Sequence, residues 1–213
     1  GYTPIADSFV ATRLSSILGD VDPDHRVQRL ATTDRTTSFV VNVGRPFRPG
    51  GSAIVGDVWG GVLVRNSGVG FASLLVSLSL IRLVCLNGMT APLADAAFKR
   101  THRAMDVTAF DAALRDHLSG LPARLLRAGN VLGRAEERRI DNVEAEVNTV
   151  LNHARLPQRL APAVLEAWRQ EARPTAFGVS QALTLAAQSQ SPEVRIELER
   201  AAGTYLAATV GSN

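Results

Sequence analysis

The stretch from residue 56 to residue 90 constrains the fold most, because β-forming apolar residues dominate it and charged residues interrupt it only three times, at Asp57, Arg65 and Arg82. Near its middle stands Asn66-Ser67-Gly68, whose residues tolerate the backbone conformations of a tight turn. The stretch therefore predicts two strands, over residues 55–64 and 71–84, joined by a short connection.

The residues before this stretch predict a helix and a further strand. Residues 6–18 place apolar side chains on one side of a short helix, and residues 36–43 are rich in β-branched and aromatic residues. Residues 45–51 then supply proline and glycine, which favour a turn, so we expect a hairpin with a basic tip. Together these segments predict an antiparallel meander of three to four strands.

After Asn87-Gly88 the apolar period changes to that of helices. Helices are predicted over residues 93–104, 107–121, 140–154, 160–172, 178–188 and 192–208. Gly120 and Pro122 should break or kink the second of these helices at its end. Strands followed by helices indicate an α+β fold, with the meander followed by a helical bundle. We expect an α+β core with basic helices over residues 1–133 and a helical part packed on it over residues 134–213. The two parts can also form one continuous domain.

Composition and cysteine content narrow the class of protein. The chain has 213 residues, of which 46% are hydrophobic, enough to bury a real core. Residues 66–81 carry no charge, but they contain glycine and serine and are too short for a membrane-spanning helix. The lone Cys85 cannot form an internal disulfide, so we expect a reducing cytoplasm. The chain begins at Gly1-Tyr2 with no apolar leader, and we expect a segment upstream of it rather than an export signal.

No catalytic constellation stands out. The four histidines lie in unrelated contexts, and the carboxylates that could hold a metal, Asp57, Asp95, Asp106 and Asp111, show no ligand spacing. We therefore predict a protein that is not an enzyme and uses no cofactor or metal.

Basic residues are concentrated in the middle of the chain, where residues 93–134 carry seven basic and four acidic groups. Positive side chains on one sheet-and-helix face could follow a sugar–phosphate backbone without reading its bases. Trp59, Phe71 and Phe47 are the aromatic residues available for base stacking. The predicted nucleic-acid-binding residues are Arg45, Arg48, Arg65, Arg82, Lys99, Arg100 and Arg103.

Five segments resemble the phage, prophage and plasmid family known as domain of unknown function 932. They are residues 62–70 (VLVRNSGVG), 81–89 (IRLVCLNGM), 98–102 (FKRTH), 174–184 (PTAFGVSQALT) and 198–203 (LERAAG). One departure is Gln181, where family members tend to have asparagine. The family has no agreed activity. The family occurs in phages and plasmids, and its strands precede its helices, as in the core of single-strand annealing recombinases. This similarity implies an oligomer that binds DNA backbones.

Two hypotheses follow. The first is a mobile-element protein that binds or anneals single-stranded DNA in recombination or repair, through phosphate contacts made by a homo-oligomer. The second is a non-catalytic structural or partner-binding protein that assembles through its C-terminal amphipathic helices, above all residues 140–154. Arg65 and Arg82 help to discriminate between these hypotheses, because a guanidinium at the end of an apolar strand must face a carboxylate, a backbone carbonyl or a phosphate.

Overall fold

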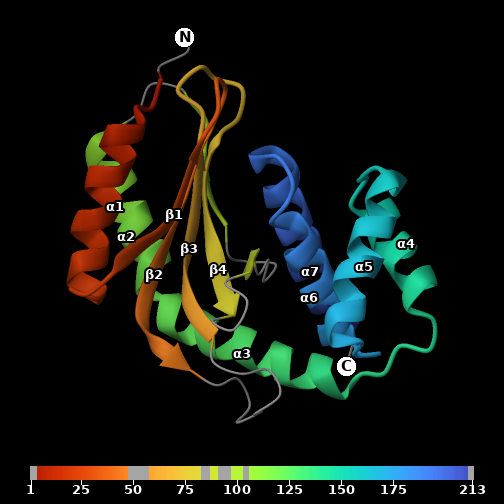
Figure 1. Ribbon diagram of the computed structural model, residues 1–213. Coiled ribbons are helices and arrows are strands. Elements are labelled where there is room, and N and C mark those ends of the chain that lie inside the picture. The colour runs from red at the N-terminus through yellow and green to blue at the C-terminus, as the bar shows by residue number, and fades with distance from the viewer. Residues whose placement is uncertain (1–3, 48–57, 83–86, 91–96, 103–105, 211–213) are drawn as a thin grey trace.

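A six-stranded antiparallel sheet stands between two groups of helices (Figure 1). The computed structural model describes residues 4–47, 58–82, 87–90, 97–102 and 106–210. The strands are β1 (Arg26–Thr32), β2 (Thr37–Phe47), β3 (Val58–Asn66), β4 (Leu74–Arg82), β5 (Asn87–Thr90) and β6 (Phe98–Arg100). The helices are α1 (Asp7–Val21), α2 (Val107–Ser119), α3 (Leu121–Glu137), α4 (Val143–His153), α5 (Ala161–Glu171), α6 (Ala176–Ala187) and α7 (Pro192–Val210), with a short 3-10 turn, η2 (Gln158–Leu160).

The sheet is a meander in the order β1-β2-β3-β4-β5, and β6 pairs with the beginning of β4. The predicted α+β class, with a meander followed by helices, is therefore confirmed. Several local predictions were wrong. No strand was predicted at β1, and none at Asn87–Thr90, which form β5 by pairing with β4. Residues 98–100, expected inside a helix, form β6 because Phe98 and its neighbours pair with β4. No helix was predicted over residues 121–137, where α3 lies.

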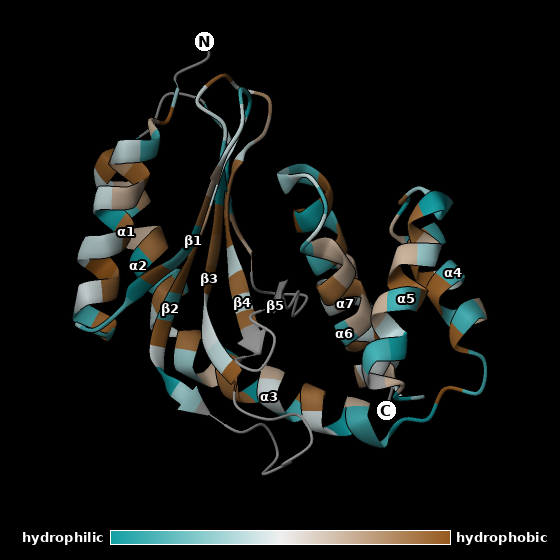
Figure 2. Cartoon of the chain, viewed as in Figure 1, coloured by the Kyte–Doolittle hydropathy of each residue, from teal (hydrophilic) through white to brown (hydrophobic). Residues whose placement is uncertain are grey.

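One face of the sheet forms the main core with α1, α2 and α3. Valine and leucine side chains of β2, β3 and β4 on this face pack against the apolar sides of these helices. Figure 2 shows the hydrophobic residues along these strands and helices in brown. Gly60 is required here, because a Cβ at this position would lie 2.3 Å from a methyl carbon of Leu125 on α3. The glycine therefore lets α3 approach β3 closely.

α3 connects the sheet to the C-terminal helices. It runs along the bottom of the molecule in Figure 1 and packs against β3 and β4 as well as α6 and α7. Gly120 separates α2 from α3, and the break there was predicted from Gly120 and Pro122. The predicted division near residue 133 falls inside this continuous helix.

α6 is the centre of the helical part, and almost all of its residues are buried. Thr175 caps it by accepting a hydrogen bond from the Gly178 amide at 3.1 Å. The Thr175 hydroxyl also donates to Glu136 at the end of α3, and Ala176 N donates to Arg138 O. Gln181 is buried on this helix. The segment that resembles the family at residues 174–184 is thus a structural core element.

Candidate nucleic-acid interface

The second face of the sheet, which lies toward α7, is unusually polar. Residues paired directly across antiparallel strands share a face, so the register places Ser38 beside Arg65 and Asn42 beside Gly61. β4 adds Ser77 and Ser79 to the same face. The apolar contact between this face and α7 is small and consists of Val40, Leu63 and Ile196 with Trp59 against them.

Hydrogen-bonding groups on this face are left unused. Asn42 Oδ1, Ser77 Oγ and Arg65 Nε are buried, and none has a hydrogen-bond partner among the described residues. Buried polar atoms usually have partners, because an unmade hydrogen bond costs about 1–3 kcal/mol. These three atoms therefore mark the face as a place where a polar ligand or water can bind.

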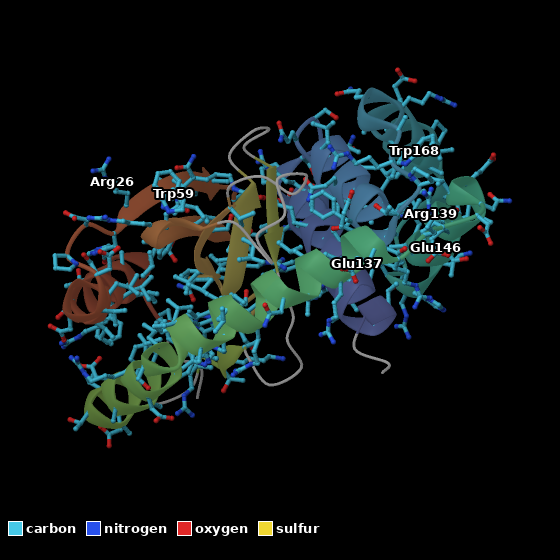
Figure 3. All side chains as sticks on the ribbon, turned by 90° about the horizontal axis from the view of Figure 1, so that it is seen from below. Arg26, Trp59, Glu137, Arg139, Glu146 and Trp168 are labelled. Atoms are coloured by element: carbon cyan, nitrogen blue, oxygen red, sulfur yellow. The ribbon has the colours of Figure 1, made fainter. Side chains whose placement is uncertain are left out.

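A small pocket lies at one end of this face, and Trp59 forms one of its walls. The Trp59 Nε1 donates to Gly44 O at 3.1 Å, which fixes the ring, and Gly44 itself adopts φ 75° at the end of the pocket. The pocket has a volume of about 190 Å³ and is lined by Asp24, Arg26, Asn42, Gly44, Arg45, Pro46 and Trp59. Figure 3 shows Arg26 and Trp59 close together at this end of the molecule. We call it the Trp59 pocket.

The size and charge of the Trp59 pocket are suited to binding one planar group of a long, negatively charged ligand. Its volume is below the range of about 300–1,000 Å³ typical of sites that enclose a whole small molecule. Arg26 and Arg45 outnumber the single carboxylate, Asp24, and both arginines are exposed. The unpartnered Asn42 Oδ1 can accept a hydrogen bond from a base edge.

Glu199 on α7 holds two arginines beside the polar face. Arg29 of β1 donates to it through both terminal nitrogens, at 2.5 Å and 2.7 Å, and Arg195 Nε donates at 3.0 Å. The glutamate is only 2% exposed, so these guanidinium groups take the place of water. Because two cations surround one carboxylate, the cluster keeps one net positive charge.

Arg65 makes a similar cluster with Glu197. Arg65 Nη1 lies 3.4 Å from Glu197 Oε1, and Arg200 pairs with the other carboxylate oxygen. Of the partners that the sequence allows for Arg65, the structure has the carboxylate, which is partly exposed. Arg65 is therefore not a free phosphate ligand, although this cluster also keeps one net positive charge.

The predicted basic residues do not form one patch. Arg45 lies in the Trp59 pocket, whereas Lys99 and Arg100 are on β6. Trp59 and Arg65 are six residues apart on β3, so the row of Arg65 and Lys99 lies about 20 Å from the pocket. Lys99 and Arg100 also point to opposite faces, since they are adjacent in a strand. Arg48 and Arg103 lie outside the described residues, and Arg82 is described only as the backbone end of β4.

Phe71, a second predicted stacking residue, lies at the other end of the sheet. Its ring is 60% exposed and has the Arg35 guanidinium 5.1 Å from its centroid. The side chain of Phe47 lies outside the described residues.

Arg26, Arg29, Arg195 and Glu199 are important on this face, and none of them was predicted as a site residue. The segment that contains the first two, RVQRLAT, could have been recognised as a strand from its valine and threonine content. The arginine–glutamate pairing had no local signal, because Arg29 and Glu199 are 170 residues apart.

Several polar residues of the opening stretch have structural roles. Asn66 Nδ2 donates to Ile5 O and to Asp7 Oδ1, both at 2.7 Å, and so ties the start of α1 to β3. Ser67 Oγ donates to Arg35 O at 2.6 Å and accepts from the Phe71 amide at 2.9 Å. These contacts shape the turn after β3, as the sequence predicted.

Two of the four carboxylates considered for metal binding have other roles in the structure. Asp106 caps α2 by accepting hydrogen bonds from Thr108 N and Ala109 N, and Asp111 pairs with Arg13 at 3.3 Å. Asp57 and Asp95 lie outside the described residues. Within the described ranges, no three histidine, cysteine or acidic side chains form a group able to hold a metal ion.

His117 on α2 has a pKa well below the ordinary value for histidine. Partial burial, and to a smaller extent the nearby Arg124 guanidinium, lower the pKa of His117 to about 4 against a smaller opposing effect of Asp116. The ring lies 6.0 Å from Phe98, and Arg124 donates to the His117 carbonyl. His117 is therefore neutral at pH 7 and packs against the sheet edge.

Comparisons with known proteins add no relative. No family model, no curated protein and no solved structure matches this chain. Among the helices of the described part of the chain, none has the length and apolar character needed to cross a bilayer.

Proposed function

We propose that this protein binds single-stranded DNA without sequence specificity, and that it does so on the polar face of its sheet. The observation that carries the proposal is the Trp59 pocket, where an aromatic ring lies beside two exposed arginines and an unsatisfied amide oxygen. Bases stack on aromatic rings whatever their identity, and arginines hold the phosphates. We extend the proposal to a role in recombination or annealing, because the chain resembles the family described above.

The proposal includes assembly into a homo-oligomer through β1. This strand ends the sheet, and Val27 and Leu30 on it are 64% and 66% exposed. An apolar edge strand of this kind can pair with another copy. Such pairing would place several Trp59 pockets along one DNA strand.

The alternative, a partner-binding protein that assembles through α4, receives less support. The stripe that suggested it is used inside the chain, since Val147, Val150 and Leu151 are all buried. A partner would therefore have to bind a different surface.

DNA binding is tested by fluorescence anisotropy with a labelled oligothymidylate at several salt concentrations. We expect affinity to fall steeply with salt, and the double variant Arg26→Glu with Arg45→Glu to lose it. Removing two phosphate contacts should reduce the salt slope of log K by about 1.4 for a single strand. Arg159→Glu with Arg169→Glu is the control, because it changes net charge equally at exposed positions on the distant helices. No binding by the natural protein at low salt, or equal losses in both variants, would show that the proposal is wrong.

A further inference from the structure

A second and larger pocket lies between α4 and α7, far from the Trp59 pocket. It has a volume of about 630 Å³, within the range of about 300–1,000 Å³ typical of small-molecule sites. α4 contributes Glu146 and the residues three, four, seven and eight positions later, and α7 contributes Ala201 and the residues at the same spacings. One full stripe of each helix therefore faces the pocket.

Several side chains of the two stripes are small and leave space between the helices. Ala154 of α4 and Ala201 and Ala208 of α7 line the pocket with methyl groups, and threonines lie between them. Larger apolar residues would have closed the two helices together. These alanines and threonines form an alanine wall, against which a planar ring can lie.

The charges around this pocket favour an anion. Arg138, Arg155 and Arg200 line it, against the single carboxylate of Glu146. Arg200 is paired with Glu197, and Arg138 donates to Thr209 O at 2.7 Å. Arg155 is exposed and has no ion-pair partner among the described residues.

The backbone at Arg155 is also unusual. This residue has φ 55°, in the left-handed region that residues other than glycine rarely adopt. It ends α4, because Leu156 N donates to Leu151 O at 2.8 Å in the hydrogen bond typical of such helix ends. Here it presents an arginine, rather than a glycine, at the end of α4.

A donor from α7 and an acceptor from α4 lie together in the pocket. Tyr205 is 9% exposed, and its hydroxyl is buried without a hydrogen bond of ordinary geometry. Burial raises the pKa of Tyr205, and the neighbouring Glu146 carboxylate raises it further. The hydroxyl therefore stays protonated and faces the Glu146 carboxylate. A ligand hydroxyl placed between them can accept from Tyr205 and donate to Glu146.

We propose that the pocket between α4 and α7 binds a small phosphomonoester that carries a planar ring and hydroxyl groups, the class to which nucleoside monophosphates belong. Arg155 and the neighbouring arginines hold the phosphate, the alanine wall receives the ring, and Glu146 with Tyr205 binds a hydroxyl or amino group. This site is separate from the Trp59 pocket and does not depend on the function proposed above.

Isothermal titration of the intact chain with adenosine monophosphate and thymidine monophosphate tests the proposal, with adenosine as the probe that lacks phosphate. Two variants locate the site. Thr204→Trp fills the pocket from an exposed position of α7, and Arg155→Gly removes the guanidinium while accepting the positive φ. Arg159→Ala removes an exposed arginine close in sequence that does not line the pocket.

At least one nucleotide should bind with one site per chain, more tightly than adenosine. Arg155→Gly should weaken binding by about tenfold to a hundredfold, the effect of one charge-assisted hydrogen bond. Thr204→Trp should abolish binding, and Arg159→Ala and the Arg26→Glu, Arg45→Glu double variant should leave it unchanged. Thermal unfolding of each variant confirms that it is folded. The proposal is overturned if neither nucleotide binds at millimolar concentration, if adenosine binds equally well, or if both pocket variants bind like the natural protein.

Discussion

Replacing Glu199 by glutamine should destabilise the protein strongly, because this carboxylate is buried between two arginines. Glutamine keeps the shape but loses the charge, and its amide NH₂ faces guanidinium donors. Removing one partner of a buried pair typically costs about 3–5 kcal/mol. Arg29 and Arg195 are 20% and 24% exposed and can partly rehydrate, so we expect the lower end, about 3 kcal/mol.

The free energy of unfolding is measured by urea titration followed by circular dichroism, with thermal unfolding beside it. For a chain of this size, about 3 kcal/mol corresponds to a fall in Tm of roughly 6–12 °C. Glu166→Gln is the matched control, because Glu166 pairs with Arg169 at 2.9 Å but both side chains are well exposed. Its cost should stay below about 1 kcal/mol. Equal stabilities of the two variants would refute the idea that Glu199 is a desolvated charge held by Arg29 and Arg195.

Three further changes test other parts of the structure. A His117→Asn variant should lose less stability in acid than the natural protein, because His117 takes up a proton near pH 6.5 in the unfolded chain and only near pH 4 in the folded one. Between pH 7 and pH 4.5, the free energy of unfolding of the natural protein minus that of the variant should fall by about 1–2 kcal/mol, a figure reduced for the partial exposure of His117. A Gly61→Ala variant should lower Tm sharply, since its Cβ would lie 2.0 Å from Val41 O, whereas Gly19→Ala, with nothing within 4 Å in α1, should raise it; the reverse order would contradict the packing of β2 on β3. An Asn66→Ala variant should lose about 2 kcal/mol and release the start of α1, visible as faster amide exchange there, and unchanged exchange would show that these hydrogen bonds are unimportant.

The sequence predicted those helices and strands in which the spacing of apolar residues follows the buried side of the element. The helices α1, α2 and α4 to α7 and the strands β2, β3 and β4 carry apolar patterns that predicted them from the sequence, whereas α3 was not predicted. β1 was missed because it is an edge strand with exposed side chains on both faces. β6 was mistaken for part of a helix because its conformation is decided by pairing with Leu74–Val76, which no local pattern encodes.

The candidate site could be predicted only in part. Arg45 and Trp59 were both noted, but their proximity depends on how β2 and β3 lie side by side, with a break in register between Val43 and Phe47. Arg65 was expected to need a partner, and that partner, Glu197, lies 132 residues further along the chain. Such long-range pairings arise from how α7 packs on the sheet, and the sequence alone gives no measure of that packing.

Fluorescence of Trp59 tests the central claim most directly. The chain has two tryptophans, so the variant Trp168→Phe leaves Trp59 as the only indole reporter. Titration with oligothymidylate at low salt should quench its fluorescence as a base stacks on the ring, and added salt should restore the signal. A Trp59 signal that does not change while the oligonucleotide binds, or an absence of binding altogether, would contradict the account.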